Sequence, residues 1–210
     1  MNHDDQFNKF ISTLYSAAKE YSKLLNLSII FESKQFTNQK SYTARFYKEN
    51  FLHLTGVKTG CTALDFYEKC FNETILTSDI NNFEKEYRNK IARKLKHLQR
   101  ISQYFLNDLQ VQENFEKNTV SCVVATSDGE KTIGFANTKP IIRIKTLLDR
   151  NQLNPNKPIL TIKPKTITLS KKWWYRGSFA IGSSLLKYVH LREVAKEINK
   201  ATTMVRARIS

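Results

Sequence analysis

The chain has 210 residues, 40% of them hydrophobic and 11% aromatic, which suits one folded domain and excludes a largely disordered protein. It carries 34 Lys and Arg against 19 Asp and Glu, a formal net charge of +15 at pH 7. Sixteen of the basic residues but only three of the acidic ones fall in residues 139–210, which favours a polyphosphate partner and leaves a merely solubilising basic surface as the alternative.

The first predicted element is an amphipathic helix over residues 7–25. Apolar residues recur there at helical spacing, and the acidic pair Asp4 and Asp5 precedes them, as suits a helix N-terminus. Extended segments follow at 27–33 and 42–48. We expect these two strands to pair across the polar stretch that separates them.

Helical spacing returns between residues 50 and 71. Interruptions near Gly56 and Gly60 predict two short helices there. The longest helix is predicted over residues 83–109, with a basic outer face and one apolar stripe. That stripe consists of Phe83, Tyr87, Ile91, Leu95, Leu98, Ile101, Phe105 and Leu109.

Short β-branched runs dominate the chain after Asn118. Strands are predicted at 119–126, 131–136, 141–145, 159–163, 165–169 and 173–181, with a last helix at 191–201. The sequence around Gly129 predicts a hairpin between the first two of these strands. Helices followed by mostly adjacent strands predict an α+β fold, in which N-terminal helices and a long central helix pack on a mostly antiparallel, twisted sheet. We expect a single domain over residues 1–210, with a strongly basic C-terminal portion from about residue 139.

The sequence offers little for metal or cofactor chemistry. Cys61, Cys70 and Cys122 have no metal-ligand spacing, and we expect reduced thiols. No carboxylate cluster for a two-metal nuclease and no glycine-rich phosphate loop is present. We therefore expect neither a metal nor a cofactor. The N-terminal residues do not resemble a signal peptide and no long apolar stretch occurs, so a cytoplasmic location without a membrane partner is expected.

RNA cleavage without a metal needs a base for the 2′-hydroxyl and cations for the phosphoryl oxygens. A histidine among lysines and arginines meets that need. His3 and His190 are expected to be surface residues, and His97 to contact phosphate or solvent. His53 lies where a strand ends and a short helix ends at Gly56. It is the catalytic candidate, with a structural histidine at a helix end as the alternative.

The segment around His53 reads Asn50-Phe51-Leu52-His53-Leu54-Thr55-Gly56, after Arg45-Phe46-Tyr47-Lys48. It resembles the N-F-x-H-L-x-G signature of the phage and mobile-element nuclease families grouped as barnase/EndoU/colicin/RelE-like. The similarity continues through Ala63-Leu64-Asp65-Phe66-Tyr67, Lys94-Leu95-x-x-Leu98, Ile133-Gly134-Phe135, Pro140 and Thr146-Leu147-Leu148. The resemblance covers about residues 25–150. It implies a small α+β ribonuclease, used as a toxin or effector, with His53, Thr55 and Thr146 as its catalytic candidates.

The candidates for nucleic-acid binding are cations and one aromatic residue. They are Lys58, Lys94, Arg143, Lys145, Lys172, Trp174 and Arg176. Arg143 and Lys145 alternate with isoleucines, so both are expected on one sheet face. Trp174 lies among three cations, a composition typical of surfaces that stack on unpaired bases. The alternatives are solvated charges for the cations and core packing for one of the two tryptophans.

Two functions follow as hypotheses. The first is a metal-independent endoribonuclease from a phage or mobile element that cleaves RNA in the cytoplasm, with His53 as the acid or base and an inhibitor or antitoxin protein as a possible partner. The second is a non-catalytic nucleic-acid-binding or anti-defence protein that uses the same basic surface. A module that binds an acidic protein is the third and weakest interpretation.

Overall fold

The computed structural model describes residues 3–81 and 85–169, which belong to one compact unit spanning residues 1–169. The strand predicted at 173–181 and the helix predicted at 191–201 lie outside the described residues. The single domain expected over residues 1–210 extends into the same region and stays a prediction.

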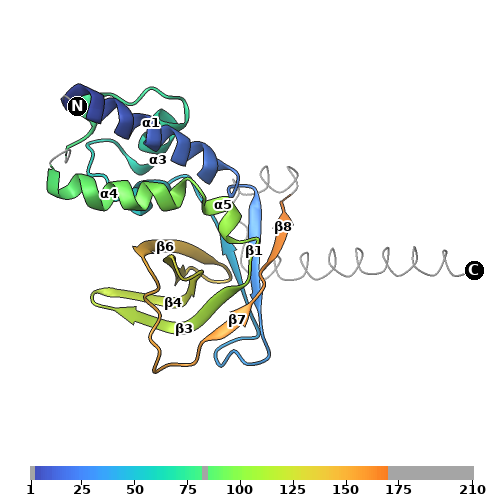
Figure 1. Ribbon diagram of the computed structural model, residues 1–210. Coiled ribbons are helices and arrows are strands. Elements are labelled where there is room, and N and C mark those ends of the chain that lie inside the picture. Colours follow the sequence, from blue (N-terminus) through green and yellow to red (C-terminus); the bar gives the residue numbers. More distant parts are fainter. Residues whose placement is uncertain (1–2, 82–84, 170–210) are drawn as a thin grey trace, which may run out of the picture. The chain divides into compact units, whose positions relative to one another are not determined.

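The helices gather on one side of the described unit, as Figure 1 shows, with α4 between α1 and the strands. They are α1 (His3–Ser22), α2 (Asn50–Thr55), α3 (Ala63–Phe71), α4 (Lys85–Leu98) and α5 (Ile101–Tyr104), with a short 3-10 helix, η1 (Thr77–Asp79), before α4. Helix α1 packs against α3 and α4. The two short helices predicted between residues 50 and 71 are thereby confirmed as α2 and α3.

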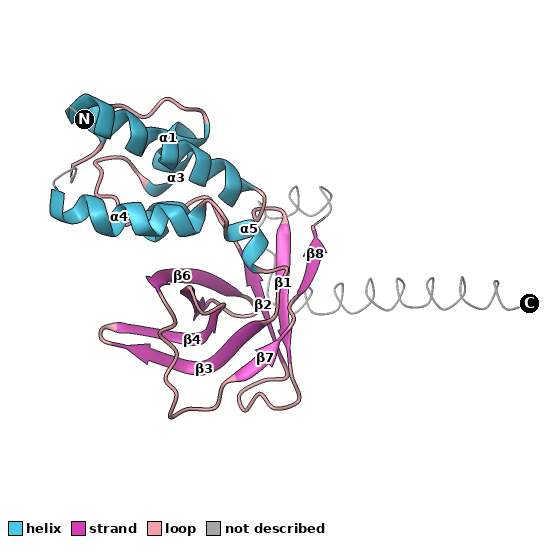
Figure 2. Cartoon of the chain, viewed as in Figure 1, coloured by secondary structure: helices cyan, strands magenta, loops and turns pink. Residues whose placement is uncertain are grey.

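The strands form one eight-stranded sheet in the order β7-β3-β4-β5-β6-β2-β1-β8 (Figure 2). They are β1 (Leu27–Glu32), β2 (Ser41–Arg45), β3 (Leu109–Lys117), β4 (Val120–Ser127), β5 (Lys131–Asn137), β6 (Ile142–Asp149), β7 (Leu160–Ile162) and β8 (Lys165–Thr168). Among the described strands, β2 and β6 pair in parallel and the other neighbours are antiparallel. The α+β class and the mostly antiparallel sheet are therefore confirmed.

An aromatic cluster joins α1, α2 and α3. Tyr21 of α1 is fully buried, and its ring centroid lies 5.5 Å from that of Phe51 and 6.2 Å from that of Tyr67. Its hydroxyl donates to the Tyr47 carbonyl at 2.9 Å. Burying one such ring contributes about 1.5–3 kcal/mol, so the cluster fixes the position of α2, which carries His53.

The helix predicted over residues 83–109 is wrong in its length. Helix α4 ends at Leu98, Arg100 has a non-helical φ of −128°, and Leu109 begins β3. The apolar stripe misleads because Phe105 and Leu109 are buried by tertiary contacts that a helix does not provide. The ring of Phe105 packs on that of Phe46 with centroids 5.4 Å apart, and Leu109 pairs with Ile162 of β7.

The pairing of β5 with β6 contains one irregularity. Gly134 lies opposite Thr146, whereas the next residue, Phe135, lies opposite Ile144. Lys145 is therefore an extra residue in β6, which is the arrangement of a β-bulge. Bulges bend a strand and redirect a side chain, and they occur often beside active sites.

Candidate active site

His53 lies on α2, a helix held by its apolar residues. Phe51 and Leu54 are fully buried, whereas His53 is exposed. The helix ends at Gly56, whose φ of 74° lies in the left-handed region that favours glycine. The Thr55 hydroxyl donates to the Leu52 carbonyl at 2.7 Å and accepts from the Val57 N–H at 3.1 Å. The sequence thus folds locally so that the imidazole faces outward.

The parallel pairing of β2 with β6 brings α2 beside a strand that is remote in sequence. Arg45, the last residue of β2, pairs with Arg143 of β6. Strand β6 continues to Asp149, while the chain after β2 turns into α2. Helix α2 contacts both β6 and α4. The site is therefore built where these three elements meet.

Two lysines from those elements act on His53. Partial burial lowers the pKa of the His53 imidazole, and the charges of Lys94 on α4 and Lys145 on β6 lower that pKa further. A lowered pKa keeps the ring neutral at neutral pH, with a nitrogen lone pair free to accept a proton. The structure therefore brings together three residues that the sequence had predicted separately.

The two lysines have different surroundings. Lys94 is half-buried, and this burial lowers the pKa of its ammonium group. Its Nζ lies 3.4 Å from where a Cβ on Gly56 would stand, so the glycine leaves room for it. Lys145 is exposed, and its Nζ donates to the Ser121 carbonyl at 2.8 Å. One cation is thus partly desolvated beside the imidazole, and the other is held by a backbone carbonyl.

Comparison with known protein families gives a match over most of the chain. The sequence model of the family phage-Barnase-EndoU-ColicinE5/D-RelE like nuclease 4 matches residues 13–173, from within α1 to beyond β8. The chain belongs to this nuclease-like family. The barnase/EndoU/colicin/RelE-like resemblance is therefore confirmed, and the family's name indicates a phage-related nuclease with nucleic acid as its substrate. We found no match to the chain among curated proteins or among solved structures.

The other residues predicted for catalysis or nucleic-acid binding in this nuclease-family chain differ in exposure. Arg143 is exposed on β6, and its guanidinium carbon lies 4.0 Å from the centroid of the Tyr47 ring. Thr55 is fully buried and Thr146 is 8% exposed. Lys58 is exposed on the segment after α2. The last three candidates lie outside the described residues: Lys172, Trp174 and Arg176.

Burial distinguishes the two catalytic threonine candidates from His53. The Thr55 hydroxyl is engaged with backbone at the end of α2, and Thr146 lies against Gly134, where its Cγ2 is 2.8 Å from the position of a Cβ on that glycine. Both threonines shape the elements that carry the site. Catalytic roles for Thr55 and Thr146 stay predictions.

One ion-pair network of this nuclease-family chain was not predicted from the sequence. His97 Nε2 lies 3.0 Å from one oxygen of Asp149, and Arg93 Nη1 lies 3.2 Å from the other. The hydrogen bond with His97 holds the pKa of the Asp149 carboxyl below its usual value, and the nearby arginine charges add to this effect. The network ties α4 to the end of β6. Its long sequence separation left no local signal for the pairing.

Neither a membrane span nor a metal cluster is found in the parts of the chain that the structure describes. No helix there is long and apolar enough to cross a bilayer. Within residues 3–81 and 85–169, no three side chains of His, Cys, Asp or Glu are grouped to hold a metal ion. Metal independence and the cytoplasmic location stay predictions.

Proposed function

We propose that the protein is a metal-independent endoribonuclease that cleaves RNA by attack of the 2′-hydroxyl on the adjacent phosphodiester. The observation that carries the proposal is the position of His53 on α2, which contacts α4 and β6, so that the charges of Lys94 and Lys145 lower the pKa of its imidazole in a nuclease-family domain. The nucleophile belongs to the substrate, so the protein has to supply a base, an acid and positive charge.

His53 takes the proton of the 2′-hydroxyl as its oxygen bonds to phosphorus. Lys94, whose ammonium pKa is lowered by burial, gives a proton to the leaving 5′-oxygen as the P–O bond breaks. Lys145 neutralises the charge that develops on the phosphoryl oxygens. The products are a 2′,3′-cyclic phosphate and a 5′-hydroxyl. RNA differs from DNA in this chemistry because only RNA carries the attacking hydroxyl.

The first experiment incubates the purified full chain with RNA in EDTA. Cleavage products with cyclic phosphate ends are expected, and a strand with a single 2′-deoxy residue at the cut position should stay intact there. The His53→Ala variant should lose cleavage by about 100-fold or more and should still bind RNA.

His3→Ala is the matched control, since it removes an imidazole near the start of α1, and it should cleave as the wild type does. Full activity of His53→Ala would remove His53 from the mechanism. Cleavage that EDTA abolishes would contradict metal independence.

A second candidate is a non-catalytic nucleic-acid-binding or anti-defence protein. The net charge of +15 favours it, because electrostatic attraction alone gives polynucleotide binding. This function predicts tight, salt-dependent binding with no products at any incubation time. A toxin role and an inhibitor or antitoxin protein as partner belong to the first candidate and are tested by co-purification with neighbouring gene products.

A further inference from the structure

Two arginines stand side by side on the sheet where β2 meets β6. Arg45 and Arg143 are register partners in the parallel ladder. Neighbouring strands lie about 5 Å apart, and residues opposite each other project from the same face. The buried neighbours of Arg45 and Arg143 in their strands, Ala44, Ile142 and Ile144, alternate with them. Both side chains therefore project from the sheet face opposite these buried residues, where Arg143 is exposed and Arg45 is partly buried.

This pair has no acidic counterpart in the described ranges. Among residues 3–81 and 85–169, no ion pair joins Arg45 or Arg143 to an Asp or Glu side chain. The Arg45 Nε is buried without a hydrogen-bond partner in the same ranges. The two positive charges stand on neighbouring strands and repel each other. Within the described ranges, this pair therefore presents two guanidinium groups that no carboxylate neutralises.

The pair is continuous with the candidate active site. Arg143 and Lys145 are both exposed on β6, and the charge of Lys145 acts on His53. Tyr47 is two residues beyond Arg45, and the centroid of its ring lies 4.0 Å from the Arg143 guanidinium carbon, a contact that restricts the orientation of that group. A side-chain oxygen of Asn50, on the same helix as His53, is also buried without a hydrogen-bond partner among the described residues.

We propose that Arg45 and Arg143 form a second phosphate site, which binds the backbone phosphate next to the one cleaved at His53. This inference rests on the proposed function for the identity of the polynucleotide, but the phosphate site itself is independent of catalysis. Guanidinium groups bind phosphate oxygens through paired hydrogen bonds. The preferred substrate is then a strand with at least two consecutive phosphates, and a dinucleoside monophosphate fills only the cleavage site.

The test measures thermal unfolding of the full chain in inorganic phosphate and in sodium chloride of equal ionic strength. Phosphate should raise the Tm of the wild type more than chloride does. Arg143→Gln and Arg45→Gln should each weaken phosphate binding roughly tenfold, as expected for losing one charged hydrogen-bonding partner. Arg100→Gln is the matched control, an exposed arginine after α4, and should keep the full phosphate effect.

Because Arg143 is exposed, its variant should fold even where Arg45→Gln does not. An unchanged phosphate effect in Arg143→Gln overturns the proposal. So does an equal loss in Arg100→Gln, because the effect would then be one of overall charge. His53→Ala should retain the phosphate effect, so a protein that never cleaves RNA can still pass this test.

Substrate length gives a second readout. The wild type should show a lower KM for a trinucleotide than for a dinucleoside monophosphate, and Arg143→Gln should remove that difference with little change in kcat. A difference in KM that survives the substitution overturns the proposal. Absence of cleavage in every protein would instead count against the endoribonuclease function and leave the phosphate measurement intact.

Discussion

At the scale of the residue, the site depends on how its neighbours alter two proton affinities. Burial and the charges of Lys94 and Lys145 lower the pKa of His53, and burial lowers the pKa of Lys94. The first shift makes the imidazole a neutral base near pH 7. The second makes the ammonium a better proton donor than an exposed lysine.

These shifts predict a bell-shaped pH dependence of kcat/KM. Activity should rise with pH as His53 loses its proton, and because its pKa is lowered the rise should occur below the ordinary range of histidine. Activity should fall again as Lys94 loses its proton, below the ordinary range of lysine. Lys145→Gln removes a charge that lowers the pKa of His53, so the acidic limb should move to higher pH.

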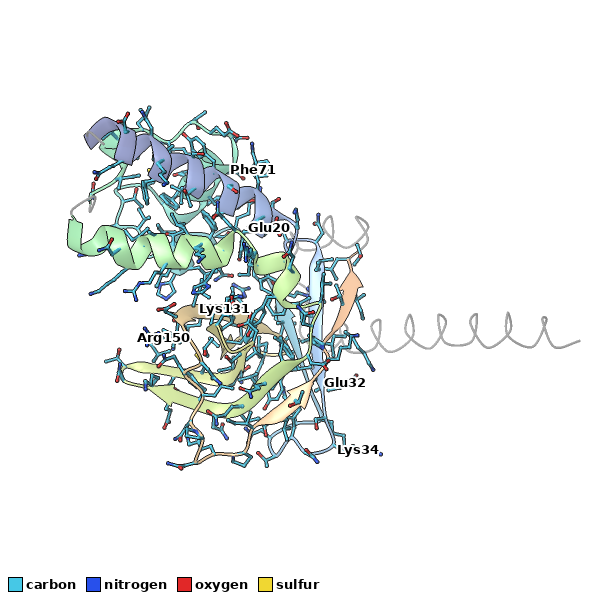
Figure 3. The ribbon with its side chains drawn as sticks, viewed as in Figure 1. Glu20, Glu32, Lys34, Phe71, Lys131 and Arg150 are labelled. Carbon is cyan, nitrogen blue, oxygen red and sulfur yellow. The ribbon has the colours of Figure 1, made fainter. Side chains whose placement is uncertain are left out.

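Lys34→Gln serves as the control for that measurement. Lys34 is exposed and lies at the end of the sheet away from α4 (Figure 3), so its loss should leave both limbs in place. An acidic limb that does not move in Lys145→Gln would contradict the electrostatic coupling of Lys145 to His53.

At the scale of the element, the bulge in β6 depends on a glycine in β5. A Cβ on Gly134 would lie 2.5 Å from Cys122 Sγ and 2.8 Å from Thr146 Cγ2, both closer than real contacts allow. Both neighbours are buried, and a threonine in a strand has a stiff side chain. Gly134 therefore permits β4, β5 and β6 to pack closely beside Lys145.

Gly134→Ala should lower the free energy of unfolding by about 1–3 kcal/mol, the usual cost of overpacking a core. Urea unfolding followed by circular dichroism measures this change. Gly60→Ala is the matched control, since nothing lies within 4 Å of a Cβ there, and its stability should fall little or not at all.

The double variant Gly134→Ala/Cys122→Ala should recover part of the loss, because it removes the sulfur atom that the new methyl group meets. Equal stability of Gly134→Ala and the wild type would show that β4, β5 and β6 can make room for a methyl group without loss of stability. The bulge would then not depend on the glycine.

At the scale of the whole molecule, some of the cations predicted to bind nucleic acid lie in the described unit and others lie in the residues beyond it. The candidate site holds Lys94, Arg143 and Lys145, while Lys172 and Arg176 follow outside the described residues. If the second group also contacts backbone phosphates, the full chain binds more phosphates than the active site alone requires.

RNA binding by the His53→Ala protein should weaken steeply with salt, as for any protein that displaces counterions. Lys172→Gln/Arg176→Gln should reduce the slope of log K against log salt by about 1.4, since each lost contact to a single strand removes about 0.7. Trp174→Ala should weaken binding with little change in slope, because stacking is not ionic.

Lys34→Gln/Lys40→Gln is the charge-matched control for this measurement, with both lysines exposed on the segment between β1 and β2. An equal change of slope in this control and in Lys172→Gln/Arg176→Gln would mean that only net charge matters. The proposed role of the C-terminal cations would then be wrong.

Local patterns in the sequence predicted most of the elements. The strands predicted at 27–33 and 42–48, the two short helices and the hairpin at Gly129 all exist, because periodicity and turn residues act over a few positions. The second strand is shorter than predicted, since β2 ends at Arg45. The predicted helix ending at residue 109 failed, because burial in a shared core supplied an apolar stripe that continued past the end of α4. No strand was predicted over residues 110–117, where β3 lies.

The sequence by itself determined the α+β class, the resemblance around His53 and the supply of cations. Only the tertiary structure decided which cations meet the imidazole. Lys94 and Lys145 are 41 and 92 positions from His53 in the chain, and the parallel pairing of β2 with β6 set Arg45 beside Arg143. Strand register and helix packing are long-range choices made by burial of the whole core, so no local pattern contains them.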